Sequence, residues 1–216
     1  STCWDIFSNT YLLMSEFAYK EIKDSTTSLF KEKGSKFIGY SFKVLNNEDV
    51  KQRLNDVRKI EYGARHFCYA YILGANKLDQ RANDDGEPSN SAGKPILGQI
   101  VACNLTNTLV VVVRYFGGTK LGVGGLITAY KTAAKECLTN ALIVEKHIKD
   151  IYKLEFDYEQ LNFVMRIQKE LDLTIEKQAL ELSCYITFSV NKNISHLALA
   201  KWKKNHKIKI EFLKTI

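Results

Sequence analysis

The apolar run at residues 109–113, Leu-Val-Val-Val-Val, constrains the fold of this chain more than any other stretch. A short run of this kind with turn-forming residues at both ends is typical of a strand buried on both faces. It is followed by the pair Gly117-Gly118 and then by residues 123–142, where apolar side chains recur at three- and four-residue spacing. That spacing predicts an amphipathic helix with one face toward the core. The stretch therefore predicts a buried strand, a glycine loop and a long helix in succession.

The residues before this stretch predict further strands and helices around a long polar loop. Alternating or aromatic-rich segments predict strands, and capped segments with three- to four-residue periodicity predict helices. The strands are predicted at residues 17–22, 36–45 and 66–73, and the helices at residues 46–60 and 96–104. Residues 74–95 are rich in Asn, Asp, Gly and Ser and are predicted to form one loop. Loops of this length in compact domains are usually functional or disordered.

Clustered charges at residues 145–150 indicate a boundary between two domains. The elements predicted beyond it are strands at residues 151–158, 174–178, 181–190 and 207–213, and helices at residues 159–171 and 194–206. Their order, β-α-β-β-α-β, is that of the split βαβ or ferredoxin-like motif. The sequence therefore predicts an α+β protein of two domains.

The composition of the 216 residues indicates which kinds of binding partner and which cellular compartment are expected. A net charge of +7 favours an anionic partner, such as RNA or an acidic protein surface. No apolar run approaches the roughly 20 residues that span a bilayer, and residues 1–14 lack the regions of a signal peptide. The five cysteines show no Cys-x-x-Cys or Cys/His metal spacing, so free thiols and a cytoplasmic location are expected.

The glycine loop, residues 117–122, combines positive charge with open backbone. Glycines let backbone N–H groups approach a ligand closely, and the following helix would present unpaired N–H groups with a partial positive charge. The spacing matches neither a Walker loop nor the dinucleotide-binding fingerprint. Two interpretations stay open: a site for phosphate or nucleic acid, and a tight crossover that needs glycines only for packing. For the first, the candidate residues are Arg65, Arg114, Gly117, Gly118, Thr119, Lys120 and Gly122.

Three acids stand close together in the acidic loop, residues 83–89. One interpretation pairs them with Arg65, Arg114 or Lys120 to shape a polar cleft. The candidate rim residues of that cleft are His66, Asp84, Asp85, Glu87 and Lys94. Two others are Mg²⁺ binding through water and a solvated turn. His66 would be a general base if it lay beside this loop, but no nucleophile motif accompanies it, so no catalytic residue and no metal ligand is predicted.

A second basic region lies near the C-terminus around Trp202. Basic residues interleaved with an aromatic residue suit RNA, through phosphate pairing and base stacking. In the alternative interpretation, Trp202 anchors a helix in the core while the lysines interact favourably with the helix dipole. The residues of this secondary basic patch are Lys201, Lys203, Lys204 and Lys207.

Several motifs together resemble the signature of the IMPACT family. They are Gly93-Lys-Pro-Ile-Leu, Arg114-Tyr-Phe-Gly-Gly-Thr-Lys-Leu-Gly122, Ala64-Arg65-His66 and Asp84-Asp85-Gly86-Glu87-Pro88. The two-domain layout resembles the bacterial YigZ branch of the family. The resemblance implies a domain at residues 15–147 similar to the second domain of ribosomal protein S5. It also implies a ferredoxin-like domain at residues 148–216, similar to a domain of elongation factor G, with residues 1–14 as an N-terminal extension.

The resemblance also implies a role in translation, because eukaryotic relatives are associated with restraining the kinase that phosphorylates initiation factor 2. Together with the basic charge, it predicts a non-enzymatic regulator that binds RNA, the ribosome or a translation-associated protein and modulates translation or its stress response. Two alternatives stay open. One is an enzyme that acts on a phosphorylated or nucleotide substrate between the acidic loop and the glycine loop, and the other is a protein-interaction module without an anion site. No cofactor, membrane partner or DNA specificity is expected.

Overall fold

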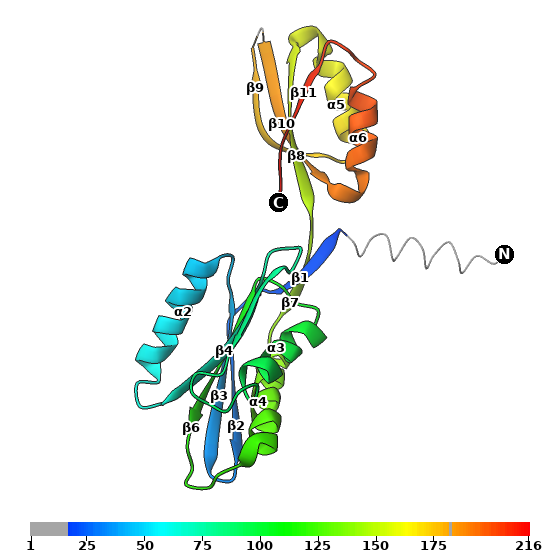
Figure 1. Ribbon diagram of the computed structural model, residues 1–216. Helices are drawn as coiled ribbons and strands as arrows, with labels where there is room; N and C mark the ends of the chain where they lie inside the picture. Colours follow the sequence, from blue (N-terminus) through cyan, green and yellow to red (C-terminus); the bar gives the residue numbers. More distant parts are fainter. Residues whose placement is uncertain (1–16, 182) are drawn as a thin grey trace, which may run out of the picture. The chain divides into compact units, whose positions relative to one another are not determined.

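The structure is a computed structural model that describes residues 17–181 and 183–216 of the chain. The N-terminal extension predicted at residues 1–14 lies outside the described residues. Residues 19–146 form one compact unit, the N-terminal unit. Residues 147–216, together with residues 17 and 18, form a second, the C-terminal unit. Both units contain helices and strands, which makes the fold mixed α+β, as predicted (Figure 1).

A five-stranded antiparallel sheet forms the centre of the N-terminal unit. Its strands, in spatial order, are β2 (Thr26–Glu32), β3 (Ser35–Lys43), β6 (Thr108–Tyr115), β4 (His66–Leu73) and β5 (Asp79–Asn83). The predicted buried strand is β6, the middle strand of the sheet. Two further strands, β1 (Ala18–Ile22) and β7 (Ile143–His147), pair separately. The sequence pattern missed β7 because nearly all of its residues are exposed and show no apolar alternation.

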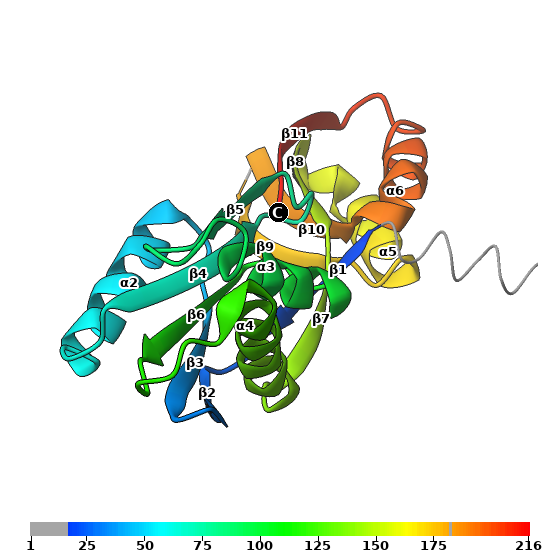
Figure 2. The same ribbon diagram turned by 60° about the horizontal axis from the view of Figure 1, so that its bottom comes forward.

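Helices cover both faces of the five-stranded sheet, as Figures 1 and 2 show. α2 (Asn47–Ile60) packs on one face, and α3 (Gly93–Ala102) and α4 (Gly122–Thr139) pack on the other. The long helix predicted after the glycine loop is α4. Within residues 17–181 and 183–216, no helix combines the length and the apolarity needed to cross a membrane.

The apolar run of β6 is explained by this three-layer arrangement. Leu109, Val111 and Val113 join the cluster beneath α2. Val110 and Val112 join the cluster beneath α3 and α4. Successive residues of a strand point to opposite faces, so a strand covered on both sides needs an uninterrupted apolar run. Full burial of each of these side chains contributes about 1.5 to 3 kcal/mol.

β3 is also covered on both faces, and a glycine lets α4 approach it closely. Tyr40 and Phe42 pack on the α2 side of β3, whereas Gly39 is buried on the α4 side. A Cβ atom on Gly39 would lie 2.5 Å from Ser28 Oγ and 3.0 Å from the carbonyl oxygen of Ala133. Ser28 Oγ itself donates to that carbonyl oxygen at 2.8 Å. Gly39 therefore sets the distance between α4 and the β2–β3 pair.

The prediction of one loop for residues 74–95 is wrong. β5 occupies Asp79–Asn83, and α3 begins at Gly93 rather than at residue 96. β5 is an edge strand without a buried residue, so it lacks the apolar alternation that identifies a strand. Asp84 Oδ1 accepts hydrogen bonds from the backbone N–H groups of Ala92 and Gly93, at 3.0 and 2.8 Å. This carboxylate caps α3 although Asp84 lies several residues before the helix. Capping residues are normally sought directly before a helix, so the sequence pattern did not reveal this one.

The C-terminal unit contains a four-stranded antiparallel sheet with two helices on one face. In chain order, its elements are β8 (Lys149–Asp157), α5 (Leu161–Glu170), β9 (Thr174–Leu180), β10 (Ser183–Asn191), α6 (Ser195–Trp202) and β11 (Lys209–Thr215). The strands lie in the spatial order β11-β8-β10-β9. The predicted sequence of strands and helices after residue 150 is confirmed, although both helices are shorter than predicted.

Replacing Gly39 with alanine is expected to destabilise the N-terminal unit, because the added Cβ has no room between Ser28 and α4. Overpacking of this kind lowers the free energy of unfolding by about 1–3 kcal/mol, which urea denaturation measures. Gly98→Ala is the matched control, because Gly98 lies in α3 with nothing within 4 Å of its Cβ position. Alanine is favoured over glycine in a helix, so this control should gain about 0.5–1 kcal/mol. Equal stability of the two variants would contradict the proposed packing of α4.

Candidate functional site

Three polar side chains meet near the end of β6 in the N-terminal unit. Arg114 is the penultimate residue of the strand, and its Nη1 donates to Glu87 Oε1 at 2.8 Å. Tyr130 of α4 donates its hydroxyl to the same carboxylate oxygen, also at 2.8 Å. The side chains of Arg114 and Glu87 are only 8% and 4% exposed. The two form a buried ion pair, in which removal of either charge would leave the other uncompensated.

Aromatic rings surround the Arg114 guanidinium. Its central carbon lies 5.6 Å from the ring centroid of Phe37 and 5.6 Å from that of Phe116, within cation–π range. The Nε of Arg114 is buried and has no hydrogen-bond partner among the described residues. Burial raises the pKa of Tyr130, so its hydroxyl stays protonated and acts as a donor to Glu87. The cation is therefore held from one side by a carboxylate and lies against two rings.

The aspartates of the acidic loop are hydrogen-bonded to backbone N–H groups. Besides capping α3 through Oδ1, Asp84 accepts a hydrogen bond at Oδ2 from the N–H of Asn90 at 2.9 Å. Asp85 Oδ2 accepts from the N–H of Phe67, in β4, at 2.7 Å. Among residues 17–181 and 183–216, no group of three or more His, Cys, Asp or Glu side chains is placed to hold a metal ion. The two aspartates therefore fasten the loop to α3 and to β4.

Two side chains of β4 also contact the acidic loop. His66 Nδ1 lies 2.9 Å from the carbonyl oxygen of Asp85, so this nitrogen carries the proton and donates. Cys68 Sγ donates to the carbonyl oxygen of Asp84 at 3.0 Å, and burial raises the pKa of this thiol. His66 thus lies beside the acidic loop, which is the position that a general base would need, but its partner there is a backbone carbonyl rather than a carboxylate.

The glycines of the glycine loop have different surroundings. Gly117 packs against the β2–β3 turn, and a Cβ atom on it would lie 1.9 Å from the carbonyl carbon of Gly34. Gly118 and Gly122 have left-handed φ values of +88° and +73°, and open space surrounds their Cβ positions. α4 begins at Gly122 without a side-chain hydrogen bond at its N-cap. Packing therefore explains Gly117, whereas the rest of the loop leaves its backbone open.

Phe116 borders three hollows on the surface of the N-terminal unit, and two of them are lined by predicted site residues. One, with a volume of about 340 Å³, lies on the side of Arg65, and the other, about 290 Å³, lies on the side of Lys120. Phe116 lines both hollows and is 60% exposed. The predicted site residues in their linings are Arg65, His66, Glu87, Arg114, Lys120 and Gly122. The structure therefore brings residues from β4, the acidic loop, β6 and the start of α4 onto one face.

Other predicted residues stand apart from this face or only near it. Gly118, Thr119 and Lys94 are exposed but do not line either hollow. The secondary basic patch belongs to the C-terminal unit. Within that unit, Lys201 pairs with Glu170 at 2.7 Å. The remaining lysines of the patch, Lys203, Lys204 and Lys207, are exposed.

The aromatic residue of the secondary basic patch is not available for base stacking. Trp202 is fully buried, and its ring packs against the rings of Tyr152 and Phe188. The alternative interpretation of Trp202, that it anchors a helix in the core, is the one that the structure supports. The exposed lysines of the patch retain only their charge as a means of binding RNA.

Sequence reasoning missed two residues of the face around Phe116. Tyr130 follows the apolar spacing of α4 and was assigned to the core, but a buried tyrosine hydroxyl requires a partner, and that requirement was the available signal. Phe116 stands beyond the apolar run and directly before Gly117-Gly118, and an aromatic residue at a glycine turn was the available signal for exposure.

The region that holds this site matches a known protein family. Residues 33–138 match the family model described as the Impact N-terminal domain. The IMPACT family member YvyE of Bacillus subtilis (strain 168) is 38% identical over 160 residues, which cover 74% of this chain and 71% of that protein. The chain belongs to the IMPACT family. Both hollows lie within the matched residues, so the candidate site is part of the Impact N-terminal domain.

Two further proteins are similar to this IMPACT family chain. The IMPACT family member YigZ of Escherichia coli (strain K12) is 34% identical over 142 residues, which cover 65% of this chain and 70% of that protein. A crystal structure described as that of a hypothetical protein shows 26% identity and a TM-score of 0.67, covering 92% of this chain and 98% of the other. The predicted resemblance to the IMPACT family and its YigZ branch is confirmed.

Removing the Glu87 carboxylate is expected to destabilise the N-terminal unit strongly. Glu87→Ala leaves the Arg114 charge buried and the Tyr130 hydroxyl unpaired, which lowers the free energy of unfolding by about 3–5 kcal/mol. Urea denaturation measures the loss, and Glu48→Ala is the control, because Glu48 pairs with Lys51 on the surface. That control should stay within about 1 kcal/mol of the parent chain. An unchanged urea midpoint for Glu87→Ala would show that the Arg114 charge does not depend on this carboxylate.

Gly117→Ala is expected to be costly for a different reason, which is the close approach of two backbones. The added Cβ overlaps the Gly34 backbone, so the β2–β3 turn must move, at a cost of about 1–3 kcal/mol or more in the free energy of unfolding. Gly124→Ala is the matched control, because nothing lies within 4 Å of its Cβ position. Thermal unfolding of the two variants decides the matter, and a loss shared equally by both would refute a packing role for Gly117.

Proposed function

We propose that this IMPACT family chain is a non-enzymatic regulator of translation that binds single-stranded RNA, free or within the ribosome, through the face around Phe116. The observation that carries the proposal is the exposed Phe116 ring between two hollows that bear the exposed cations Arg65 and Lys120. An aromatic platform flanked by cations is the arrangement with which proteins bind single-stranded nucleic acid. The net charge of +7 adds attraction to phosphate.

The groups of this face have separate roles in the proposal. The Phe116 ring stacks on a base, and Arg65 and Lys120 pair with phosphates on either side of it. The open backbone of the glycine loop and the start of α4 add N–H donors and a partial positive charge. Arg114 supports the Phe116 ring through its cation–π contact, while Glu87 offsets its charge. Arg114 is therefore a positioning residue in this proposal, and the exposed cations make the phosphate contacts.

The link to translation is supported by the family. The signature motifs of this chain resemble those of relatives associated with control of translation initiation, and a basic face with an exposed aromatic ring suits RNA on or near the ribosome. A regulator of this kind acts in the cytoplasm. A translation-associated protein with an acidic surface would use the same cations but would not need the stacking role of Phe116.

We also infer a finer fold assignment for each unit. The order β-α-β-β-α-β and the spatial order β11-β8-β10-β9 support a ferredoxin-like fold for the C-terminal unit. For the N-terminal unit, a likeness to the second domain of ribosomal protein S5 rests on the family resemblance. For the proposed domains at residues 15–147 and 148–216, the compact units support a boundary close to residue 147, although residues 17, 18 and 147 belong to the C-terminal unit.

The enzymatic alternative has less support, because the acids of the acidic loop are already engaged. A general base must reach the proton that it removes. Asp84 and Asp85 accept backbone hydrogen bonds, and Glu87 is held by Arg114 and Tyr130. His66 uses its Nδ1 to bind a backbone carbonyl. The hollows beside Phe116 thus contain exposed cations and an aromatic ring. The carboxylate that lines one of them, Glu87, is already paired with Arg114.

The proposal is tested by equilibrium binding of a fluorescent single-stranded RNA, an oligouridylate, at several salt concentrations. Phe116→Ala should weaken binding by about 5- to 150-fold, the equivalent of roughly 1–3 kcal/mol per stacked base. Arg65→Ala/Lys120→Ala should reduce the slope of log K against log salt by about 1.4, because two phosphate contacts are lost. Fluorescence anisotropy measures both effects.

Two control variants separate this face from the rest of the surface. Tyr158→Ala removes an aromatic residue of the C-terminal unit that is also 60% exposed, and it should leave RNA binding unchanged. Lys203→Ala/Lys204→Ala removes two exposed charges of the secondary basic patch, and a loss confined to this variant would move the site to the C-terminal unit. Binding no tighter than the non-specific range of roughly 10⁻⁴–10⁻⁶ M would end the RNA proposal and favour a protein-interaction module.

A further inference from the structure

β2 is one edge of the five-stranded sheet, where β3 is its partner on one side only. The register with β3 runs without a shift to the pair Glu32 and Ser35, which closes a two-residue turn. Hydrogen-bonded and non-hydrogen-bonded pairs alternate along an antiparallel ladder, and such a turn closes on a hydrogen-bonded pair. The backbone groups of Thr27, Leu29 and Lys31 therefore point away from β3, toward the open edge.

This edge has few of the features with which sheets usually prevent further pairing. Protected edges are short, charged, bulged or interrupted by proline. β5, the other edge of the sheet, has five residues and carries Asp79 and Arg81. β2 has seven residues and no bulge in its pairing with β3, and its two charged residues, Lys31 and Glu32, follow an uncharged segment from Thr26 to Phe30. The edge of β2 is therefore available for another strand.

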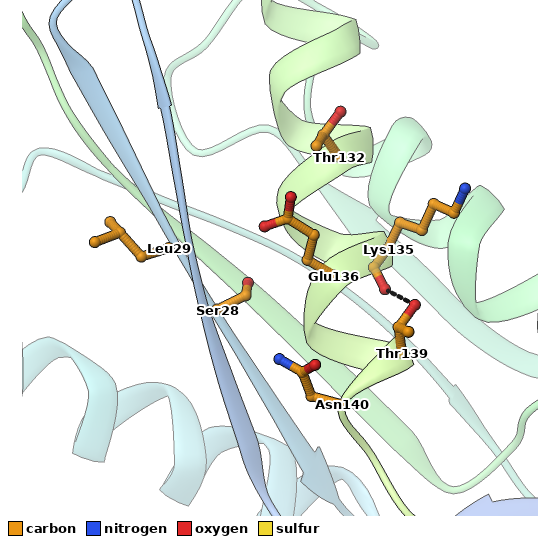
Figure 3. A pocket seen from close by; sticks show the side chains of 7 residues that line it. All are labelled: Ser28, Leu29, Thr132, Lys135, Glu136, Thr139 and Asn140. Carbon is orange, nitrogen blue, oxygen red and sulfur yellow. Dashed lines mark hydrogen bonds between the residues drawn. The ribbon is translucent and has the colours of Figure 1, made fainter.

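A hollow of about 560 Å³ lies beside this edge, between β2 and α4. Figure 3 shows Ser28 pointing from β2 toward the helix and Leu29 pointing away from it. Leu29 is 54% exposed. The helix residues that line the hollow form one stripe of α4 and its end, and they are Thr132, Lys135, Glu136, Thr139 and Asn140. The stripe is polar, and the hollow separates it from Ser28 and Leu29 of β2.

We propose that β2 of a second copy of this chain pairs with β2 in antiparallel orientation, about a two-fold axis at Leu29. In this register Leu29 lies opposite Leu29, and Thr27 lies opposite Lys31, so all the outward backbone groups find partners. Thr26 lies opposite Glu32, and no two like charges face each other across the new pair. The strand is thus complementary to itself, as a two-fold interface requires.

The position of α4 relative to β2 is also compatible with pairing of the two β2 strands. Thr26 Oγ1 donates to the carbonyl oxygen of Cys137 and Ser28 Oγ to that of Ala133, while Gly39 of β3 lies against the same helix. The helix therefore lies over the boundary between β2 and β3. With strands about 4.8 Å apart, pairing of the two edges places the two α4 helices about 10 Å apart. Packed helices are 8–10 Å apart, so each α4 fills the hollow of the other copy.

The hydrogen bonds between β2 and α4 determine which helix residues face each other under this symmetry. Ser28 bonds to Ala133 and Thr26 bonds to Cys137, so α4 runs antiparallel to β2 and an axis at Leu29 passes close to Thr132. Thr132, a polar residue of the stripe, then faces Thr132 of the other copy. The Asn140 side chain donates to the carbonyl oxygen of Thr27 at 3.3 Å, a long bond that the strand of the second copy replaces. Self-complementarity in register and in helix spacing favours a second copy over an unrelated strand.

Sedimentation equilibrium of the full 216-residue chain tests the proposal. Over roughly 1 to 500 µM, the mass should rise from 24.7 kDa toward twice that value, because one strand and one helix per copy make a small interface. Leu29→Lys places two like charges at the axis and should weaken the dimer by about tenfold or more. Leu78→Lys is the matched control, because Leu78 is 80% exposed and precedes β5 at the other edge of the sheet. It should leave dimerisation unchanged.

A substitution in α4 tests the helix contact independently of the strand. Thr132→Asp places two like charges next to each other at the axis and should weaken the dimer, whereas Thr132→Asn, whose side chain has the size of aspartate but no charge, should not. Amide hydrogen exchange at Thr27, Leu29 and Lys31 should slow as the chain concentration rises. A monomer at every concentration would overturn the proposal and leave the edge to an extended segment of another protein. A dimer that Leu29→Lys does not affect would overturn it too, by placing the interface elsewhere.

Discussion

The buried ion pair between Glu87 and Arg114 connects three parts of the N-terminal unit that are distant in sequence. Glu87 brings the acidic loop, Arg114 brings the end of β6, and Tyr130 attaches α4 to the same carboxylate. A charge pair with so little exposure is retained only when its geometry and its hydrogen bonds offset the loss of hydration. The position of the exposed Phe116 ring follows from this pair, because the ring lies against the Arg114 guanidinium.

The other acids of the loop serve the same end by different bonds. Asp84 caps α3, and Asp85 holds the N–H of Phe67 in β4. The acidic loop therefore directs its three carboxylates inward, toward two helices and two strands. This leaves the cations Arg65 and Lys120 as the exposed charges of the hollows. A loop that looks like a negatively charged rim in the sequence thus has a positively charged face beside it in the fold.

Much of the fold follows from local patterns, and much of the site does not. The run at residues 109–113 identified a strand buried on both faces, because it is short, rich in β-branched valine and bounded by turn-forming residues. β5 was not predicted, because an exposed edge strand has no alternation of apolar and polar residues. The direction of each acidic side chain was also beyond prediction, since it depends on donors that the fold brings from other segments, such as the N–H of Gly93 for Asp84. Trp202 illustrates the same limit, because its neighbours in sequence are lysines while its neighbours in space are Tyr152 and Phe188.

Because each unit contains at least one buried cysteine, the rate of thiol modification measures how often that unit opens. Cys68 and Cys137 are buried in the N-terminal unit, and burial raises the pKa of both thiols. Cys184 is buried in the C-terminal unit. The thiolate is the form that reacts, so a thiol in such a setting is modified only while the surrounding structure is transiently open. The rates at which an alkylating reagent modifies Cys137 and Cys184 therefore report the separate opening equilibria of the two units within one intact chain.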